Sequence, residues 1–126
     1  NVRDHLNEGG LFIFDFWYGP AVLTDLPKAT IKRLENEHIK VTRVAESKMH
    51  AQLNTVDVNF NVFVTQKEDG TSIEKKELHI MRYFFDTELE MLCDKHGFKI
   101  ENKYKWLEKK QPNFDTWNVV WVLKKN

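Results

Sequence analysis

The chain has 126 residues, of which 41% are hydrophobic and 13% aromatic, enough to fill one moderate core and too apolar for a disordered protein. Nineteen basic and nineteen acidic residues give a formal net charge of zero, which argues against a nucleic-acid partner and against an anionic membrane surface. The single cysteine, Cys93, excludes an internal disulfide, and no apolar run reaches the roughly 20 residues of a membrane span. With no apolar leader segment in the first residues, we expect one folded domain in a reduced, cytoplasmic setting.

The first predicted strand is apolar on both faces. Val2 to Asn7 have the pattern of a helix end, which Gly9 and Gly10 would terminate with positive φ angles. Leu11 to Phe16 then contain one polar residue, Asp15, and such a strand belongs in the middle of an α/β sheet. Because too few residues precede it to form a strand, we expect it to pair with later strands on one edge and to have no native neighbour on the other.

The middle of the chain changes from mixed signals to a clear period of two. Tyr18-Gly19-Pro20 interrupts the first strand, and the spacing of Ile31 and Leu34 predicts a short helix over residues 26–34. A period of two from Ile39 onward predicts strands at 39–46 and 56–64, of which the second alternates most clearly. We expect residues 72–84 to return as the partner strand of 56–64. The turn at 67–70 joins the last two in a long hairpin.

The last third predicts one helix and a second hairpin. Leu89, Leu92, Cys93 and His96 lie on one face of a predicted helix over 86–96. We expect Asp86 to cap it by accepting a hydrogen bond from a first-turn amide, and Gly97 to end it. Alternation over 98–107 and the apolar run 117–123 predict two antiparallel strands, with the lysines of 103–110 on the solvated face.

This order of elements resembles the C-terminal half of class I S-adenosylmethionine-dependent methyltransferases, over nearly the whole chain. The segment from Leu6 to Asp15 resembles the turn and fifth strand of that family, Glu88 to Phe98 the following helix and sixth strand, and Trp117 to Leu123 the reversed seventh strand. The insertion ending in His79-Ile80-Met81-Arg82-Tyr83-Phe84 is similar to the antiparallel flap of small-molecule methyltransferases such as the amino-sugar N-methyltransferases.

The resemblance implies an α+β fold, half of an α/β Rossmann-like methyltransferase. We expect a mixed, largely antiparallel sheet with one main helix at 86–96 and a β-hairpin flap. Within a single domain of residues 1–126, the partial methyltransferase core would be 1–38 and 85–126, and the flap insertion 39–84.

One departure from the family concerns the cofactor. Its members hold S-adenosylmethionine with an acidic residue and a Gly-rich turn that follows the first strand. Here the one glycine pair, Gly9-Gly10, precedes a strand. We therefore expect no cofactor-binding residue in this chain, S-adenosylmethionine in the intact parent only, and no activity from the chain alone.

Five residues are candidate substrate contacts. Asp15, Trp17 and Tyr18 follow the buried strand, where open α/β sheets place ligands; the acid can hold an amine or a hydroxyl, and the rings can form an apolar wall. A turn acid with two packing aromatics is the alternative. Arg82 and Tyr83 end the flap strand, and Arg82 needs an acidic partner, either on a substrate or, as we favour, within the chain, because an unpaired buried charge is costly.

The remaining polar candidates are weaker. His79 is a candidate catalytic base, since an unperturbed pKa of roughly 6.5 suits proton abstraction, although a histidine satisfied within its strand is favoured. His38, His50 and Cys93 lack the spacing of a structural zinc site, so we expect no metal. Trp106, Trp117 and Trp121 suggest either a stacking surface or, preferably, core.

Three functions remain open from the sequence. The first is the substrate-side, C-terminal part of a methyltransferase for a small molecule. The second is a non-enzymatic remnant that forms a homo-oligomer through strand edges, either of the flap hairpin or of the Leu11 strand. The third is a separate α+β ligand-binding fold, with an antiparallel sheet closed around its own pocket.

Overall fold

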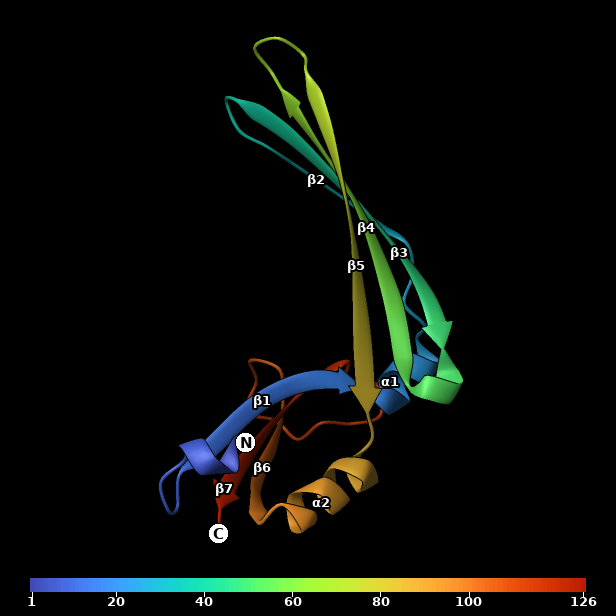
Figure 1. The fold of residues 1–126 in the computed structure, drawn as a ribbon. Coiled ribbons are helices and arrows are strands. Elements are labelled where there is room, and N and C mark those ends of the chain that lie inside the picture. The colour runs from blue at the N-terminus through green and yellow to red at the C-terminus, as the bar shows by residue number, and fades with distance from the viewer. The chain divides into compact units, whose positions relative to one another are not determined.

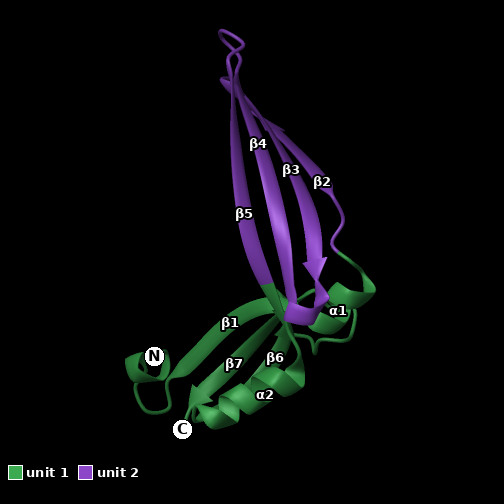
Figure 2. Ribbon diagram, turned by 45° about the vertical axis from the view of Figure 1, so that its right-hand side comes forward, with its two compact units in different colours: residues 1–26, 82–126 green, residues 27–81 purple.

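A computed structural model describes all residues, 1–126, and the chain divides into two compact units. Unit 1 comprises residues 1–26 and 82–126, and unit 2 comprises residues 27–81 (Figure 2). The unit boundaries therefore follow Leu26 and Met81, whereas the sequence placed the edges of the insertion at 38/39 and 84/85. Neither unit contains a helix with the length and apolar character needed to cross a membrane.

Unit 1 is a small sheet with a helix on one face (Figure 1). Its elements are η1 (Arg3–His5), β1 (Leu11–Tyr18), α1 (Gly19–Thr24), the end of β5 (Ser72–Phe84), α2 (Asp86–Lys95), β6 (Phe98–Lys105) and β7 (Asn118–Lys125). β7 lies between β1 and β6 and is antiparallel to both. On its other edge β1 pairs with β5 only at Trp17 and Tyr18, in parallel. Residues 11–16 thus have a strand partner on one edge only.

The core of unit 1 lies between this sheet and α2. It is formed by seven buried side chains, namely Phe16, Leu89, Cys93, Phe98, Val119, Trp121 and Leu123. Alternation along β1 directs Phe12, Phe14, Phe16 and Tyr18 towards that core. The opposite face carries Leu11, Ile13, Asp15 and Trp17, and there Leu11 is 52% and Ile13 61% exposed. Both faces of β1 are apolar, but unit 1 buries only the face that points towards α2.

The helix α2 begins where predicted and ends one residue earlier, at Lys95, but it lacks the predicted cap. Phe85, in extended conformation, is the N-cap residue and makes no side-chain capping bond. Asp86 is instead the first helical residue, and its carboxylate accepts a hydrogen bond from Lys103. Gly97, with a φ of 70°, follows the helix as expected.

The predicted helix over 26–34 is wrong. Residues Thr30–Glu35 form β2, an edge strand antiparallel to β3, and the helix of this region is α1, which begins earlier and has Pro20 in its first turn. Ile31 and Leu34 suggested a helical face by their spacing, but in the strand they lie on opposite faces, beside Val44 and Val41. Pairing with β3 makes these residues a strand, and a local sequence pattern does not show such pairing.

Unit 2 is an antiparallel sheet in the order β2-β3-β4-β5. β3 (Ile39–His50) and β4 (Thr55–Gln66) pair along their whole length and are joined through η2 (Ala51–Leu53). The β4–β5 hairpin expected from the sequence is present, with Gly70 at a φ of 73° in its turn. Ala45, Val56 and Val58 are the buried apolar residues of this unit.

Candidate functional site

The structure separates the candidate residues more than the sequence suggested. β1 continues to Tyr18, so Asp15 and Trp17 lie on its open face while Tyr18 lies on the face covered by α2. Tyr83 is the register partner of Trp17 across the β1–β5 pair, and Arg82 precedes it. His79 belongs to unit 2.

Trp17 is part of an aromatic pair at the C-terminal end of β1. Its ring meets that of Trp117 with the centroids 5.3 Å apart and the planes at 71°. The Tyr18 N–H donates to the Trp117 carbonyl oxygen at 2.8 Å, which holds the residue before β7 against the end of β1. Both indoles are half-buried. Trp117, which the sequence placed preferably in the core, is therefore part of this end of the sheet.

Asp15 lies on the same face, two residues before Trp17. Across the β1–β7 register its neighbour is Val120, and along the strand it is flanked on this face by Ile13 and Trp17. Asp15 is exposed, and its carboxylate has no ion-pair or hydrogen-bonding partner within the chain. The open face thus presents a free carboxylate in apolar surroundings beside two indole rings.

Tyr83 is fully buried and acts as a packing residue. Its ring meets Phe85 edge to face, with the centroids 6.0 Å apart, and burial raises the pKa of its hydroxyl. That hydroxyl has no hydrogen-bond partner. A substrate contact through Tyr83, as considered from the sequence, would require its surroundings to open.

Arg82 confirms the expectation of an acidic partner within the chain. Its guanidinium forms an ion pair with Glu88 of α2 and lies 4.8 Å from the centroid of the Phe84 ring. The side chain is 51% exposed. Arg82 therefore fastens the end of β5 to α2 and needs no anionic substrate to balance its charge.

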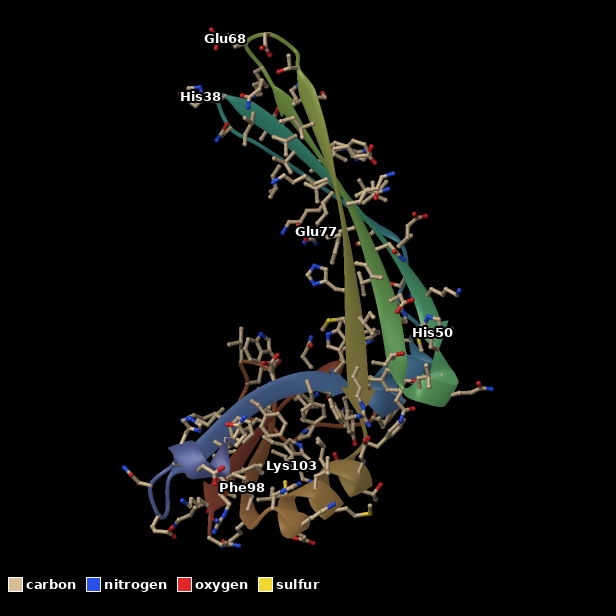
Figure 3. All side chains as sticks on the ribbon, in the orientation of Figure 1. His38, His50, Glu68, Glu77, Phe98 and Lys103 are labelled. Atoms are coloured by element: carbon tan, nitrogen blue, oxygen red, sulfur yellow. The ribbon has the colours of Figure 1, made fainter.

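Lys103 is the residue whose position differs most clearly from the sequence prediction. A β-bulge between Ile100 and Asn102 shifts the register, so Lys103 lies on the face covered by α2 instead of the solvated face (Figure 3). Its Nζ donates to Glu90 Oε1 at 2.8 Å and to Asp86 Oδ2 at 3.0 Å, and lies 4.3 Å from the centroid of the Trp121 ring. Alternation alone gives no sign of a bulge.

The electrostatics of this cluster follow from its contacts. Burial by itself lowers the pKa of Lys103, but the hydrogen bonds to Glu90 and Asp86 outweigh it and the pKa is raised. Burial, followed by the negative charge of Asp86, raises the pKa of Tyr18. Tyr18 thus belongs with this clamp between β6 and α2, apart from Asp15 and Trp17.

A groove of about 540 Å³ runs between β1 and α2. Phe12, Phe14 and Phe16 line one side, and Leu89, Leu92 and Cys93 line the other. Burial, with a smaller contribution from the charge of Asp94, raises the pKa of the Cys93 thiol. A thiol held in its protonated form is a poor nucleophile. The lining of the groove is mostly apolar, but it also includes the charged residues Arg3 and Asp4 and the imidazole of His96.

His79 lies in unit 2 with partners of its own. Its Nε2 is 3.2 Å from Glu77 Oε2, and its ring meets that of Phe60 edge to face at 5.1 Å. This is the satisfied strand histidine that the sequence favoured. Nowhere do three His, Cys, Asp or Glu side chains come together as a metal site.

This chain is similar to known proteins in its structure and not detectably in its sequence. No protein-family model matches the sequence, and no curated protein does. A solved S-adenosylmethionine-dependent methyltransferase from Clostridium acetobutylicum ATCC 824 matches with a TM-score of 0.80 at 21% identity, covering 99% of this chain and 48% of that one. This chain has the fold of half a methyltransferase.

Two further solved structures match this chain over a similar share of their own length. DesVI of Streptomyces venezuelae has a TM-score of 0.73 at 15% identity and covers 98% of this chain and 48% of its own. CalS10, an amino pentose methyltransferase from Micromonospora echinaspora, has a TM-score of 0.72 at 15% identity, and the match covers 99% of this chain and 48% of CalS10. The chain therefore spans about half the length of the chains it matches, consistent with a C-terminal half.

Proposed function

We propose that this chain is the substrate-side, C-terminal half of an S-adenosylmethionine-dependent methyltransferase that acts on a small molecule. One observation carries the proposal: the whole chain superimposes on less than half of a methyltransferase, at a TM-score of 0.80. The exposed Leu11 and Ile13 and the unpaired edge of β1 support it, since a strand apolar on both faces is stable when buried on both.

The cofactor would be held by the other half of the enzyme. In this chain no Gly-rich turn follows a strand and opens a helix, so the residues present do not fit the methionine or ribose groups of S-adenosylmethionine. The contribution of this half would be to bind and orient the acceptor. Positioning of that kind supplies a large part of the rate enhancement in two-substrate reactions.

Asp15 and Trp17 are the proposed acceptor contacts. The Asp15 carboxylate would accept a hydrogen bond from the acceptor N–H or O–H, and Trp17 would form an apolar wall beside it. We favour an amine over a hydroxyl because Asp15 has no cation of its own, and a positively charged donor would compensate its charge once the face is covered. The matched structures include an amino pentose methyltransferase and a sugar N-methyltransferase, KedS8.

A methyl-transfer assay tests this function. The part of the Clostridium acetobutylicum enzyme that this chain does not cover would be joined upstream of Asn1, and labelled methyl groups followed into amino sugars. We expect transfer, with Asp15→Asn reducing the rate at least about tenfold, as loss of a charged hydrogen bond does. Asp94→Asn, at an exposed position on α2, is the matched control. Equal rates for the two variants would contradict the role of Asp15.

A second candidate is the self-associating, non-enzymatic domain. The observation that favours it is the open edge of β1, where residues 11–16 offer unpaired backbone groups between exposed apolar side chains. Two copies could pair through this edge about a two-fold axis. The separate ligand-binding fold has less support, because β1 lies inside the sheet of unit 1, between β7 and the end of β5.

A further inference from the structure

Trp117 is held in place by hydrogen bonds on both sides. Before it, the Thr116 hydroxyl donates to Asn113 Oδ1 at 2.7 Å and accepts from the Asn113 N–H at 3.1 Å. At Trp117 itself the carbonyl accepts from Tyr18, and the next carbonyl, of Asn118, accepts from Trp106 at 3.0 Å. Thr116 is the buried polar residue of the chain, at 9% exposure. These bonds fix the backbone from which the Trp117 ring projects, and the ring itself packs against that of Trp17.

The ring of Trp117 forms a corner with that of Trp17. An edge-to-face pair at 71° presents two apolar surfaces at a steep angle. Each indole is only half-buried, so part of its surface remains free for a ligand. Asp15 lies on the same strand face as Trp17, two residues away. The corner and the carboxylate can therefore be occupied by one small molecule.

We propose that Trp17 and Trp117 form an aromatic corner that selects acceptors carrying a ring next to the nitrogen bound by Asp15. This inference rests on the proposed function and adds a specificity-determining residue, Trp117. An acyclic amine reaches the carboxylate but leaves both indole surfaces in contact with water. A ring removes that apolar surface from water, which favours cyclic acceptors.

A pair of amines of equal charge tests the corner directly. The 126-residue chain would be titrated with cyclohexylammonium and with methylammonium while the indole N–H signals are followed by NMR. We expect the cyclic amine to bind roughly five- to tenfold more tightly, as the burial of one ring predicts. Equal affinities, or no shift with cyclohexylammonium, would overturn the proposal.

Two substitutions separate Trp117 from a general loss of structure. Trp117→Leu keeps an apolar side chain but removes the wall, so the preference for the cyclic amine should disappear while methylammonium binding stays. Trp106→Leu, on the same hairpin and 47% exposed, is the control and should keep the preference. If both variants behave alike, Trp117 has no part in selection.

A third variant tests positioning without removing a ring. Thr116→Val deletes the hydroxyl bonded to Asn113 and should reduce the cyclic preference by part of the Trp117→Leu effect. An unchanged preference would contradict the positioning of Trp117 by this turn. None of these titrations uses S-adenosylmethionine. If they show no preference for the cyclic amine, the aromatic corner is contradicted, while the methyl-transfer assay can still give transfer to another acceptor.

Discussion

Gly19 is the position where a single methyl group would disturb the end of β1 most. A Cβ there would lie 2.5 Å from two carbons of the Phe85 ring, and Phe85 in turn packs on Tyr83 and precedes α2. The close approach thus couples the start of α1 to the end of β5.

We expect Gly19→Ala to lower the free energy of unfolding by about 1–3 kcal/mol, the range for overpacking, as measured by urea denaturation. Gly70→Ala is the comparison, since its Cβ would meet nothing within 4 Å and the φ of 73° alone would cost about 1 kcal/mol. A smaller loss at Gly19 than at Gly70 would refute the steric explanation.

Cys93 predicts how stability responds to alkaline pH. Burial raises its pKa from the ordinary value of 9.0, so above that pH the unfolded chain loses a proton that the folded chain retains. The stabilisation is therefore complete below pH 9.0 and declines as the pH rises towards the folded-state pKa. Burial also raises the pKa of Tyr18 from its ordinary value of 10.0, so Tyr18 lowers the stability in the same way above that pH.

Urea midpoints measured at neutral pH and in steps above pH 9 test this linkage. We expect the wild-type midpoint to fall in that range, and Cys93→Ala, although less stable throughout, to show a shallower initial fall. Parallel curves for the two proteins would show that the thiol makes no contribution.

At the scale of elements, the Lys103 clamp joins β6 to α2. Its ammonium bonds two carboxylates one helical turn apart, Asp86 and Glu90, and lies over Trp121. With Lys103 only 21% exposed, the group is more protected from solvent than an ordinary surface pair.

Lys103→Met should destabilise the chain by about 1–2 kcal/mol through loss of the ion pairs and the cation–π contact. Lys99→Met is the matched control in the same strand; Lys99 is 67% exposed beside Glu101, and its loss should cost less than about 0.5 kcal/mol. Thermal unfolding of both variants checks the difference, and equal losses would argue against the clamp.

The elements that the sequence predicted best are those with long, regular periods. β4 and α2 each carry an apolar pattern over ten or more residues, and Gly97 marks the end of the helix. The exposed strand β2 has no such pattern, and its structure depends on pairing with β3. Local sequence could not show that pairing.

The candidate site was predictable in part. The position of Asp15 and Trp17 near the end of a buried strand followed from sequence, but the strand runs two residues further than expected, so Tyr18 faces α2. The bulge that redirects Lys103 and the turn that fixes Trp117 have no sequence pattern that distinguishes them from regular strand and loop.

At the scale of the whole molecule, the open edge of β1 predicts that the chain associates when nothing covers it. The zero formal net charge provides no long-range repulsion between copies. We expect sedimentation velocity to show concentration-dependent dimers, and Ile13→Lys to abolish them by placing a charge on the exposed face. Ile80→Lys, at a position 66% exposed in unit 2, should leave them intact. A wild-type monomer at every concentration would exclude the self-associating alternative.

The central claim is that this chain is a substrate-side half whose cofactor is held by another half. Isothermal titration with S-adenosylmethionine tests it most directly, on the 126-residue chain and on the same chain joined to the uncovered part of the Clostridium acetobutylicum enzyme. We predict no binding by the chain alone and micromolar binding by the joined protein. Micromolar binding by the chain alone would contradict the account.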